Sequence, residues 1–296
     1  MSILHTVIFP VAGRGTRLLP LTKSIPKELL PVYDKPILQF AVEEALAAGA
    51  RRLVLITHAS KTSIPDYLTP DAELIDILQS DGKAKLAEAL KDISLGDEVD
   101  VVFVEQDEPL GLGHAVLMAA DHVGSGETFG VILPDDVMLG QPCLSEMAGA
   151  YNGGHMIAAM EVEAEHVSRY GIFRPFASDN DDAGQAMRAS ELVEKPEPQD
   201  APSRLAAVGR YILDARIFDS LRGLAPGAGG EYQLTDAIAD DAQRMPLTAF
   251  RFSGQRFDCG SHEGLLSAAN ARAAEVQRGP VASTGPVAAA KAVAAE

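Results

Sequence analysis

Residues 11–31 read VAGRGTRLLPLTKSIPKELLP and follow directly on a short apolar run at residues 6–11, TVIFPV. The run has the length and composition of a strand that is buried on both faces, and the glycines end it in a turn. Gly13 and Gly15 therefore lie at the carboxyl edge of a predicted parallel sheet, where α/β folds bind their ligands. Because glycine has no Cβ, backbone N–H groups at this turn can approach a bound anion closely.

The same segment is rich in cations, which indicates a phosphate-binding loop. The cations are Arg14, Arg17, Lys23 and Lys27. A guanidinium can pair two phosphate oxygens at once, whereas a lysine acts as a point charge. Two familiar phosphate loops do not fit, because Leu18 replaces the third glycine of the dinucleotide-binding motif and Thr16-Arg17 replaces the Lys-[Ser/Thr] of the P-loop. A plain glycine turn with a solvated basic face is the alternative.

The rest of the chain predicts one main α/β domain. A helix is expected over residues 36–48, with Pro36 at its first position and Gly49 after its end. Strands are expected at residues 52–57, 101–104, 128–133, 155–162 and 206–213, helices within 71–93, and a polar turn at 178–185. This order predicts a mostly parallel central sheet with helices on both faces, and the closer strands after Gly154 predict a smaller antiparallel flap in the second half.

The composition limits the classes of function. The chain has 25 Lys and Arg against 42 Asp and Glu, a net charge of −17, which argues against binding nucleic acid or an anionic membrane. It contains neither an apolar run of about 18 residues nor a signal-peptide pattern. Cys143 and Cys259 have no metal-ligand spacing and agree with a reducing, cytoplasmic setting. Residues 279–296 are rich in Ala, Gly and Pro, so we expect the folded domain to span 1–278 and this stretch to be a low-complexity tail.

Several strings, in order along the chain, resemble the signature of the sugar-1-phosphate nucleotidyltransferases. Besides the glycine segment they are THASKTSIPDYL (57–68), GLGHAVLMA (111–119), LPDD (133–136), LVEKPEP (192–198), GRYIL (209–213), GEYQLTDAI (230–238) and RFDCGS (256–261). The resemblance covers residues 3–276 and is strongest to the bacterial UTP–glucose-1-phosphate uridylyltransferases. It implies a Rossmann-like nucleotidyltransferase fold, with a nucleotide-binding part at about 1–150 and a sugar-phosphate-binding part at about 151–278. His262 stands where this family commonly has lysine.

The resemblance implies an enzyme that transfers a uridylyl group from UTP to α-D-glucose 1-phosphate, forming pyrophosphate and UDP-glucose for polysaccharide biosynthesis. Because both reactants are polyanions, alignment and charge neutralisation can carry the reaction without a protein nucleophile. Two alternatives stay open: a thymidylyltransferase that uses dTTP, and a nucleotide-sugar-binding regulator that does not catalyse. A Rossmann dehydrogenase is disfavoured by Leu18. The family also implies a homodimer or homotetramer, with a helix over 264–276 as a candidate contact.

The resemblance also assigns the groups that bind the nucleotide phosphates. Arg17 would bind the β- and γ-phosphates that leave, and Lys27 the α-phosphate. Ala12 and Gly13 would hold the nucleotide through backbone groups.

The metal implied is Mg²⁺, held by Asp135 and Asp258, since this ion needs one or two carboxylates and takes its other ligands from phosphate and water. Asp135 follows a predicted strand, which places it at the same sheet edge as the glycines. Asp136 would contact the ligand. The seven histidines include no H-x-H or H-E-x-x-H pair, and His114 has a packing or capping role at least as readily as a ligand contact.

The sugar and the base are assigned to three other strings. Lys195 would bind the sugar phosphate, Glu194 would accept sugar hydroxyls, and Gly171 would offer a backbone N–H. Gln106 and Gly111 resemble the base-reading segment, because a side-chain amide with a backbone group matches the donor and acceptor of a pyrimidine edge. Uracil and thymine differ by one methyl, worth about 1–3 kcal/mol at most, so this pair separates pyrimidines from purines more sharply than U from T.

Overall fold

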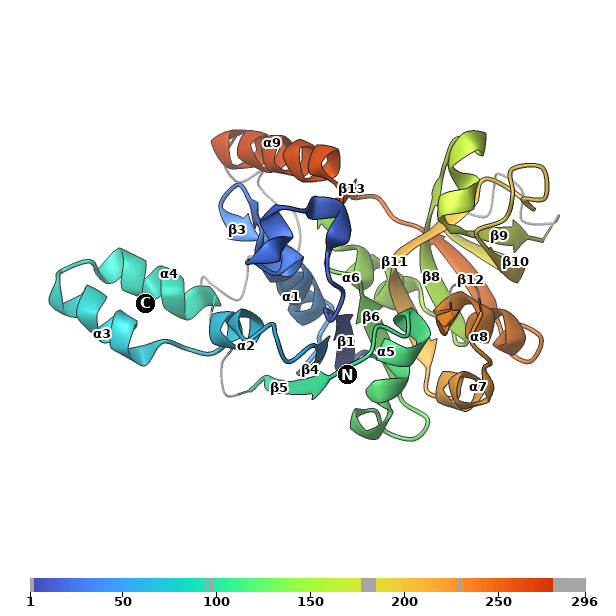
Figure 1. The fold of residues 1–296 in the computed structure, drawn as a ribbon, viewed down its shortest axis with the longest axis horizontal. Coiled ribbons are helices and arrows are strands. Elements are labelled where there is room, and N and C mark those ends of the chain that lie inside the picture. Colours follow the sequence, from blue (N-terminus) through green and yellow to red (C-terminus); the bar gives the residue numbers. More distant parts are fainter. Residues whose placement is uncertain (1–2, 94, 96–97, 177–184, 228–229, 279–296) are drawn as a thin grey trace.

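Strands and helices alternate along the chain in the computed structural model, which describes residues 3–93, 95, 98–176, 185–227 and 230–278 (Figure 1). The strands are β1 (Thr6–Pro10), β2 (Pro31–Val32), β3 (Lys35–Pro36), β4 (Arg52–Thr57), β5 (Asp100–Glu105), β6 (Thr128–Ile132), β7 (Asp136–Leu139), β8 (His155–Glu161), β9 (Gly171–Pro175), β10 (Ala186–Glu194), β11 (Leu205–Asp214), β12 (Leu247–Arg251) and β13 (Gln255–Asp258). The helices are α1 (Ile37–Ala47), α2 (Ser63–Leu68), α3 (Ala72–Ser80), α4 (Ala84–Ile93), α5 (Leu112–Met118), α6 (Cys143–Ala150), α7 (Ile217–Gly223), α8 (Leu234–Asp241) and α9 (His262–Arg278).

The predicted elements form close to their expected bounds. Each of the six predicted strands ends within one residue of its expected limits. Pro36 immediately precedes α1 instead of occupying its first position, and Gly49 lies just beyond the helix with a positive φ of 99°. The tail at 279–296 and the polar turn expected at 178–185, except for residue 185, lie outside the described residues.

The central sheet combines parallel and antiparallel strands. Within the described ranges it contains nine strands, in the order β5-β4-β1-β6-β11-β8-β12-β10-β9. Strands β5, β4, β1 and β6 are parallel, as are β8 and β12. In contrast, β11 pairs antiparallel with both β6 and β8, and β10 with both β12 and β9. The expectation of a mostly parallel sheet therefore fits only its first half, because β11 enters in the opposite direction.

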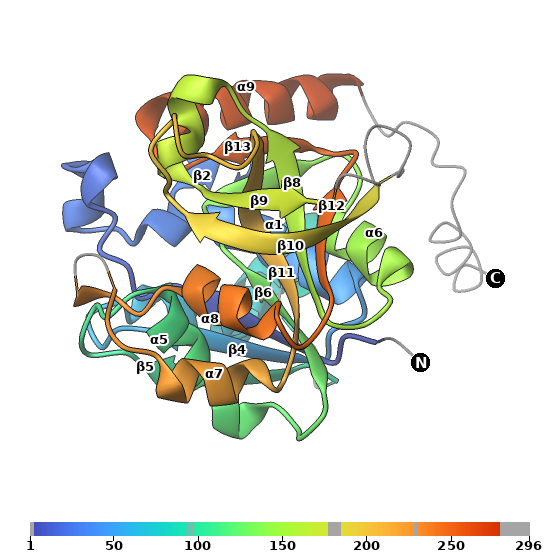
Figure 2. The ribbon, with the colours of Figure 1, turned by 90° about the vertical axis from the view of Figure 1, so that its right-hand side faces the viewer.

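The antiparallel flap expected in the second half is part of this same sheet. Strand β9 pairs with β10 at the end of this sheet and also pairs, through Ile172 and Ala206, with β11 (Figure 2). The sequence did not predict β9 or β10, and the reason is visible in β10, AMRASELVE, whose apolar residues alternate with polar ones instead of forming a run. This alternation is typical of a strand with one face in the core and the other toward solvent.

Helices cover both faces of the sheet, as predicted. On one face α5, α7 and α8 pack against Ile8 and Val131, and on the other α1, α2 and α6 pack against Val7 and Leu53. Neighbouring side chains of a strand point to opposite faces, so Val7 and Ile8 enter different halves of the core. This explains the unbroken apolar run of β1.

Two helical regions lie outside these layers. Helices α3 and α4 form a pair that projects from the body of the molecule, and α3 contains no buried residue (Figure 1). Helix α9 packs through Ala268 on the small sheets β2–β3 and β7–β13. Among the described residues, no helix combines the length and apolarity needed to cross a membrane.

A buried ion pair joins α1 to β11. Arg210 and Glu44 are both buried, and Arg210 Nη2 lies 2.7 Å from Glu44 Oε2. Arg210 Nη1 also donates to the carbonyl of Leu133 at 3.1 Å, while Glu44 Oε1 accepts from the backbone N–H of Leu144 at 2.9 Å. The pair thus fixes the chain after β6, two residues before Asp135.

Substitution of Arg210 by methionine should be strongly destabilising, since it leaves the Glu44 carboxylate buried without its partner. We expect Arg210→Met to lower the free energy of unfolding by about 3–5 kcal/mol in urea denaturation. The control is Arg174→Met, which breaks a 2.7 Å pair between Arg174 and Glu191 whose side chains are 52% and 47% exposed. An exposed pair contributes about 0–1 kcal/mol. Equal losses in the two variants would contradict this interpretation of the buried pair.

Candidate active site

The glycine segment after β1 folds back on itself through three short 3₁₀ turns, Thr16–Leu18, Leu21–Lys23 and Lys27–Leu29. The hydroxyl of Thr22 donates to the carbonyl of Gly15 at 2.8 Å. A Cβ on Gly15 would lie 3.3 Å from the Cβ of Lys27. The fold-back therefore brings Lys27, distant in sequence from the end of β1, beside the glycine turn.

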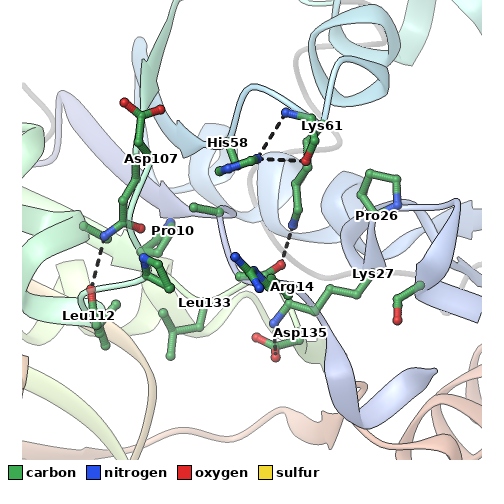
Figure 3. A pocket seen from close by; sticks show the side chains of 18 of the residues that line it. Pro10, Arg14, Pro26, Lys27, His58, Lys61, Asp107, Leu112, Leu133 and Asp135 are labelled. Atoms are coloured by element: carbon green, nitrogen blue, oxygen red, sulfur yellow. Dashed lines mark hydrogen bonds and ion pairs between the residues drawn. The ribbon is translucent and has the colours of Figure 1, made fainter. Parts of the chain in front are cut away.

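Two cavities open at this edge of the sheet. The larger, of about 710 Å³, lies between the glycine segment and the β5–α5 connection (Figure 3). Of the predicted site residues it is lined by Ala12, Gly13, Lys27, Gln106, Gly111 and Asp135. The smaller, of about 370 Å³, is lined by the remaining predicted residues, Arg17, Asp136, Gly171, Glu194, Lys195 and Asp258, and again by Asp135. The structure thus brings every predicted site residue to one of two cavities that share Asp135.

Cations and carboxylates meet where the cavities join. Lys27 Nζ lies 2.7 Å from Asp135 Oδ2, and Figure 3 shows the two side chains pointing at each other. Arg17 lies 3.8 Å from Asp135 and 3.4 Å from Asp258, so its guanidinium spans both carboxylates. Burial alone would raise the pKa of Asp135, but Lys27 and then Arg17 outweigh it and hold that pKa below its ordinary value. Asp135 is therefore ionised and able to bind a further cation.

Backbone pairing places the second aspartate of this cluster. Strands β7 and β13 are antiparallel, with Asp258 opposite Asp136. The N–H of Cys259 donates to the carbonyl of Asp135 at 2.7 Å. These contacts hold Asp258 beside Asp135 although more than a hundred residues separate them.

Asp136 differs from its neighbour because internal donors occupy its carboxylate. Its Oδ1 accepts from Arg256, and its Oδ2 accepts from the N–H of Gly209 at 2.8 Å. Arg256 also lies over the ring of Tyr170, 5.6 Å from its centroid. Asp136 lines the smaller cavity while it braces the wall of that cavity.

The smaller cavity ends at β9 and β10. Gly171 pairs with Glu194 across these strands, and Glu194 Oε2 accepts from the hydroxyl of Thr235 at 2.9 Å. Lys195 Nζ lies 3.0 Å from Glu194 Oε1. The backbone of Lys195 has a φ of 43°, in the left-handed region that a residue with a Cβ rarely adopts. Such strain is concentrated at functional sites.

Gln106 and Gly111, the candidates for contact with the base, line the larger cavity on the side of the β5–α5 connection. Gln106 follows β5, is 5% exposed, and donates its backbone N–H to the carbonyl of Thr57 at 2.7 Å. Gly111 precedes α5 with a φ of 95°. A Cβ there would lie 2.8 Å from Glu231 and 2.9 Å from the carbonyl of Tyr232, so the position requires glycine.

Lys61, which precedes α2, is a functional candidate that the sequence did not reveal. Its side chain is nearly buried, and Nζ donates to the carbonyls of Val11 at 2.5 Å and Gly13 at 2.7 Å and to Glu28 Oε2 at 2.8 Å. The three protons of an ammonium group therefore all have acceptors. Lys61 lies within one of the strings quoted above, but only its contacts show that it holds the glycine turn.

The contacts of Lys61 also orient the turn. In a planar trans peptide the C=O and N–H point in opposite directions. Because the carbonyls of Val11 and Gly13 face Lys61, the N–H groups of Ala12 and Arg14 point away from it. In the described part of the chain no group accepts a hydrogen bond from either N–H. These N–H groups are available to an anionic ligand in the larger cavity.

The chain is similar to known nucleotidyltransferases over most of its length. The family model described as nucleotidyl transferase matches residues 6–275, and the chain belongs to this family. It is 41% identical to the UTP–glucose-1-phosphate uridylyltransferase of Pseudomonas aeruginosa over 273 residues. The alignment covers 90% of this chain and 95% of that protein.

Two solved structures are similar over almost their whole length. One is UDP-glucose pyrophosphorylase complexed with UDP-glucose, at 38% identity, with a TM-score of 0.80 and coverage of 92% of this chain and 99% of that one. The other is a UTP-bound UGPase from Acinetobacter baumannii, at 39% identity, with a TM-score of 0.81 and coverage of 91% and 93%. The α/β nucleotidyltransferase fold implied by the sequence is thereby confirmed.

Removal of the Lys61 ammonium should loosen the glycine turn and impair nucleotide binding. We expect Lys61→Met to raise the KM for UTP about tenfold or more, because two hydrogen bonds to the turn and one to Glu28 are lost, while the KM for glucose 1-phosphate stays within about twofold. Steady-state kinetics measure both constants. Lys91→Met, which removes an exposed lysine of α4, is the control and should change neither. An equal rise in both KM values in Lys61→Met would count against a specific role at the turn.

Proposed function

We propose that this chain forms UDP-glucose by transfer of a uridylyl group from UTP to α-D-glucose 1-phosphate, with release of pyrophosphate. The observation that carries the proposal is the meeting of two cavities at Asp135, with Lys27 and Arg17 beside it. Such a site can hold two phosphate-bearing reactants next to each other. Its resemblance to uridylyltransferases at about 40% identity supports UTP and glucose 1-phosphate as these reactants.

The larger cavity binds UTP in this proposal. Ala12 and Gly13 hold the nucleotide through backbone groups, and Lys27 binds the α-phosphate. Arg17, which lines the smaller cavity beside Asp135, reaches across to bind the leaving β- and γ-phosphates. A sugar-phosphate oxygen attacks the α-phosphorus in line, and the bond to the pyrophosphate oxygen breaks. The chain contributes alignment and positive charge, which is how phosphoryl-transfer sites commonly act.

The smaller cavity binds glucose 1-phosphate. Lys195 neutralises its phosphate and aims an oxygen at the larger cavity. Glu194 accepts hydroxyls of the sugar, and Thr235 holds that carboxylate in place through the 2.9 Å hydrogen bond. Gly171 offers its backbone N–H to the sugar. Asp136 contacts the ligand at the cavity wall, and Arg256 and the N–H of Gly209 fix the orientation of the Asp136 carboxylate.

Asp135 and Asp258 would hold a Mg²⁺ ion. The donor set fits, because both groups are oxygen ligands and because the Arg17 guanidinium lies within 4 Å of each carboxylate, which supports one common position for a cation. In the described residues no cluster of three or more His, Cys, Asp or Glu side chains could hold a metal, so the other ligands would be phosphate oxygens and water. When bound, the ion supplies further neutralisation of phosphate charge.

The organisation of the chain follows the same division. Residues 1–278 form one nucleotidyltransferase domain, with the nucleotide-binding part at about 1–150 and the sugar-phosphate-binding part at about 151–278. We also place the enzyme in the cytoplasm, consistent with two buried free cysteines, and as a homodimer or homotetramer. Helix α9 remains a candidate contact, since Leu266 and Val276 on it are 63% and 42% exposed. His262, exposed at the start of this helix, lines neither cavity.

Loss of the Asp135 carboxylate should nearly abolish turnover. We expect Asp135→Asn to lower kcat by about 10³-fold or more at saturating Mg²⁺, because a charged ligand and the partner of Lys27 are lost together. Pyrophosphate release measures the rate, and electron paramagnetic resonance of Mn²⁺ in the presence of UTP should show weakened binding. Asp100→Asn, at an exposed ion pair on β5, serves as the control. A rate near that of the unmodified enzyme would remove Asp135 from the metal site.

Loss of the Lys195 ammonium should affect the second substrate alone. We expect Lys195→Ala to raise the KM for glucose 1-phosphate about tenfold or more, because a charge-assisted contact to phosphate is lost, with little change in the KM for UTP. A rise confined to the KM for UTP would show that Lys195 does not bind the sugar phosphate.

The choice of nucleotide is tested on the unmodified enzyme, with UTP and dTTP in parallel. A higher kcat/KM with dTTP would favour the thymidylyltransferase alternative. Absence of turnover of the unmodified enzyme with either nucleotide would favour a regulator.

A further inference from the structure

The amide of Gln106 has a defined environment at the end of the larger cavity. Its Nε2 lies 2.8 Å from Nδ1 of His114, in the first turn of α5, and 3.5 Å from the carbonyl of Gly111. The side chain is 5% exposed and lines the cavity. Both neighbours of the amide thus lie on the α5 side of it.

These neighbours determine which end of the amide faces the cavity. A backbone carbonyl can only accept a hydrogen bond, so the NH₂ end of Gln106 is the end that faces Gly111. His114 Nδ1 then accepts the other proton of that NH₂ group, which requires the ring proton on Nε2. In the described part of the chain no donor reaches Gln106 Oε1. The carbonyl oxygen is therefore the end left for a ligand.

We propose that His114 is a positioning residue that fixes the Gln106 amide with its oxygen toward the base and thereby selects uracil over cytosine. The proposal rests on the base-reading role proposed for Gln106. Uracil carries an N–H donor at N3, which an amide oxygen accepts. Cytosine carries an unprotonated acceptor at N3, so two acceptors would face each other. If the amide could rotate by 180°, its NH₂ group would face the base and could donate to N3 of cytosine instead.

His114 acts through Gln106 and not by contact with the nucleotide. It is absent from the residues that line the larger cavity, whereas Gln106, Gly111 and Leu112 line it. Its ring lies 6.1 Å from that of Tyr232, at a tilt of 34°. Tyr232 in turn accepts from the N–H of Gly113 at 2.8 Å and donates to the carbonyl of Leu110 at 2.8 Å. The histidine is therefore held between α5 and the segment before α8.

The test is the ratio of kcat/KM for UTP to that for CTP at saturating glucose 1-phosphate. His114→Leu removes the acceptor, and we expect it to lower this ratio about 10- to 100-fold, the range for one hydrogen bond lost or mismatched at a buried site. The KM for glucose 1-phosphate should stay unchanged. His114→Gln can present an amide oxygen to Nε2 and should restore much of the ratio. His122→Leu, a histidine just after α5 that lines neither cavity, is the matched control.

A second variant keeps the test decisive if His114→Leu does not fold. His114→Lys offers only donors, so the oxygen of Gln106 should turn toward residue 114 and the ratio should again fall. An unchanged ratio in a folded His114→Leu or His114→Lys variant would overturn the proposal. An equal loss with UTP and CTP would also overturn it, because that result indicates a purely structural role.

Gln106→Ala separates this inference from the proposal on which it rests. We expect Gln106→Ala to lower the ratio, and the double variant with His114→Leu to lower it no further, since His114 acts only through the amide. If Gln106→Ala leaves the ratio unchanged, the base-reading role itself is wrong. If Gln106→Ala lowers it and the His114 variants do not, base reading stands and the positioning role of His114 is wrong.

Discussion

The contact between Lys27 and Asp135 is the interaction on which the geometry of both cavities depends. It joins the glycine segment to the β6–β7 connection at 2.7 Å, at a position that the two cavities share. The surrounding backbone keeps Asp135 there, through the N–H of Cys259 on one side and the hold of Arg210 on Leu133 on the other. Because a buried charge without its partner is costly, these segments have a strong reason to stay together.

This local arrangement explains how a strongly acidic chain can have a site suited to phosphate groups. The net charge is −17, yet the groups around the larger cavity include Arg14, Lys23, Lys27 and Lys61. At physiological ionic strength charges are screened over roughly 8–10 Å, so a phosphate in the cavity responds mainly to these near cations. The acidity of the remaining surface argues against binding of nucleic acid but has little influence on a phosphate at this site.

The sequence predicted those parts of the structure that depend on local pattern. The apolar runs fixed six strands, and the position of Gly13 and Asp135 after two of them placed both at one edge of the sheet. Contacts between distant segments were beyond its reach. Lys61 and Glu28 are 33 residues apart in the sequence, and Arg210 and Glu44 are 166 residues apart. The residues around each of them contain no local pattern that predicts the partner. The direction of β11 was also not predicted, because a strand buried on both faces is a continuous apolar run whether its neighbours are parallel or antiparallel.

The position of β11 has a consequence for biosynthesis of the chain on the ribosome. β11 lies between β6 and β8, and its residues, 205–214, emerge long after both of these strands have been made. Until then β6 has one unpaired edge and β8 has no partner strand at all, because its other neighbour, β12, is made later still. Unpaired strands of this kind associate readily with other chains. The nascent chain therefore passes through a stage in which β8 cannot join the first half of the sheet, and the synthesis of β11 links the two.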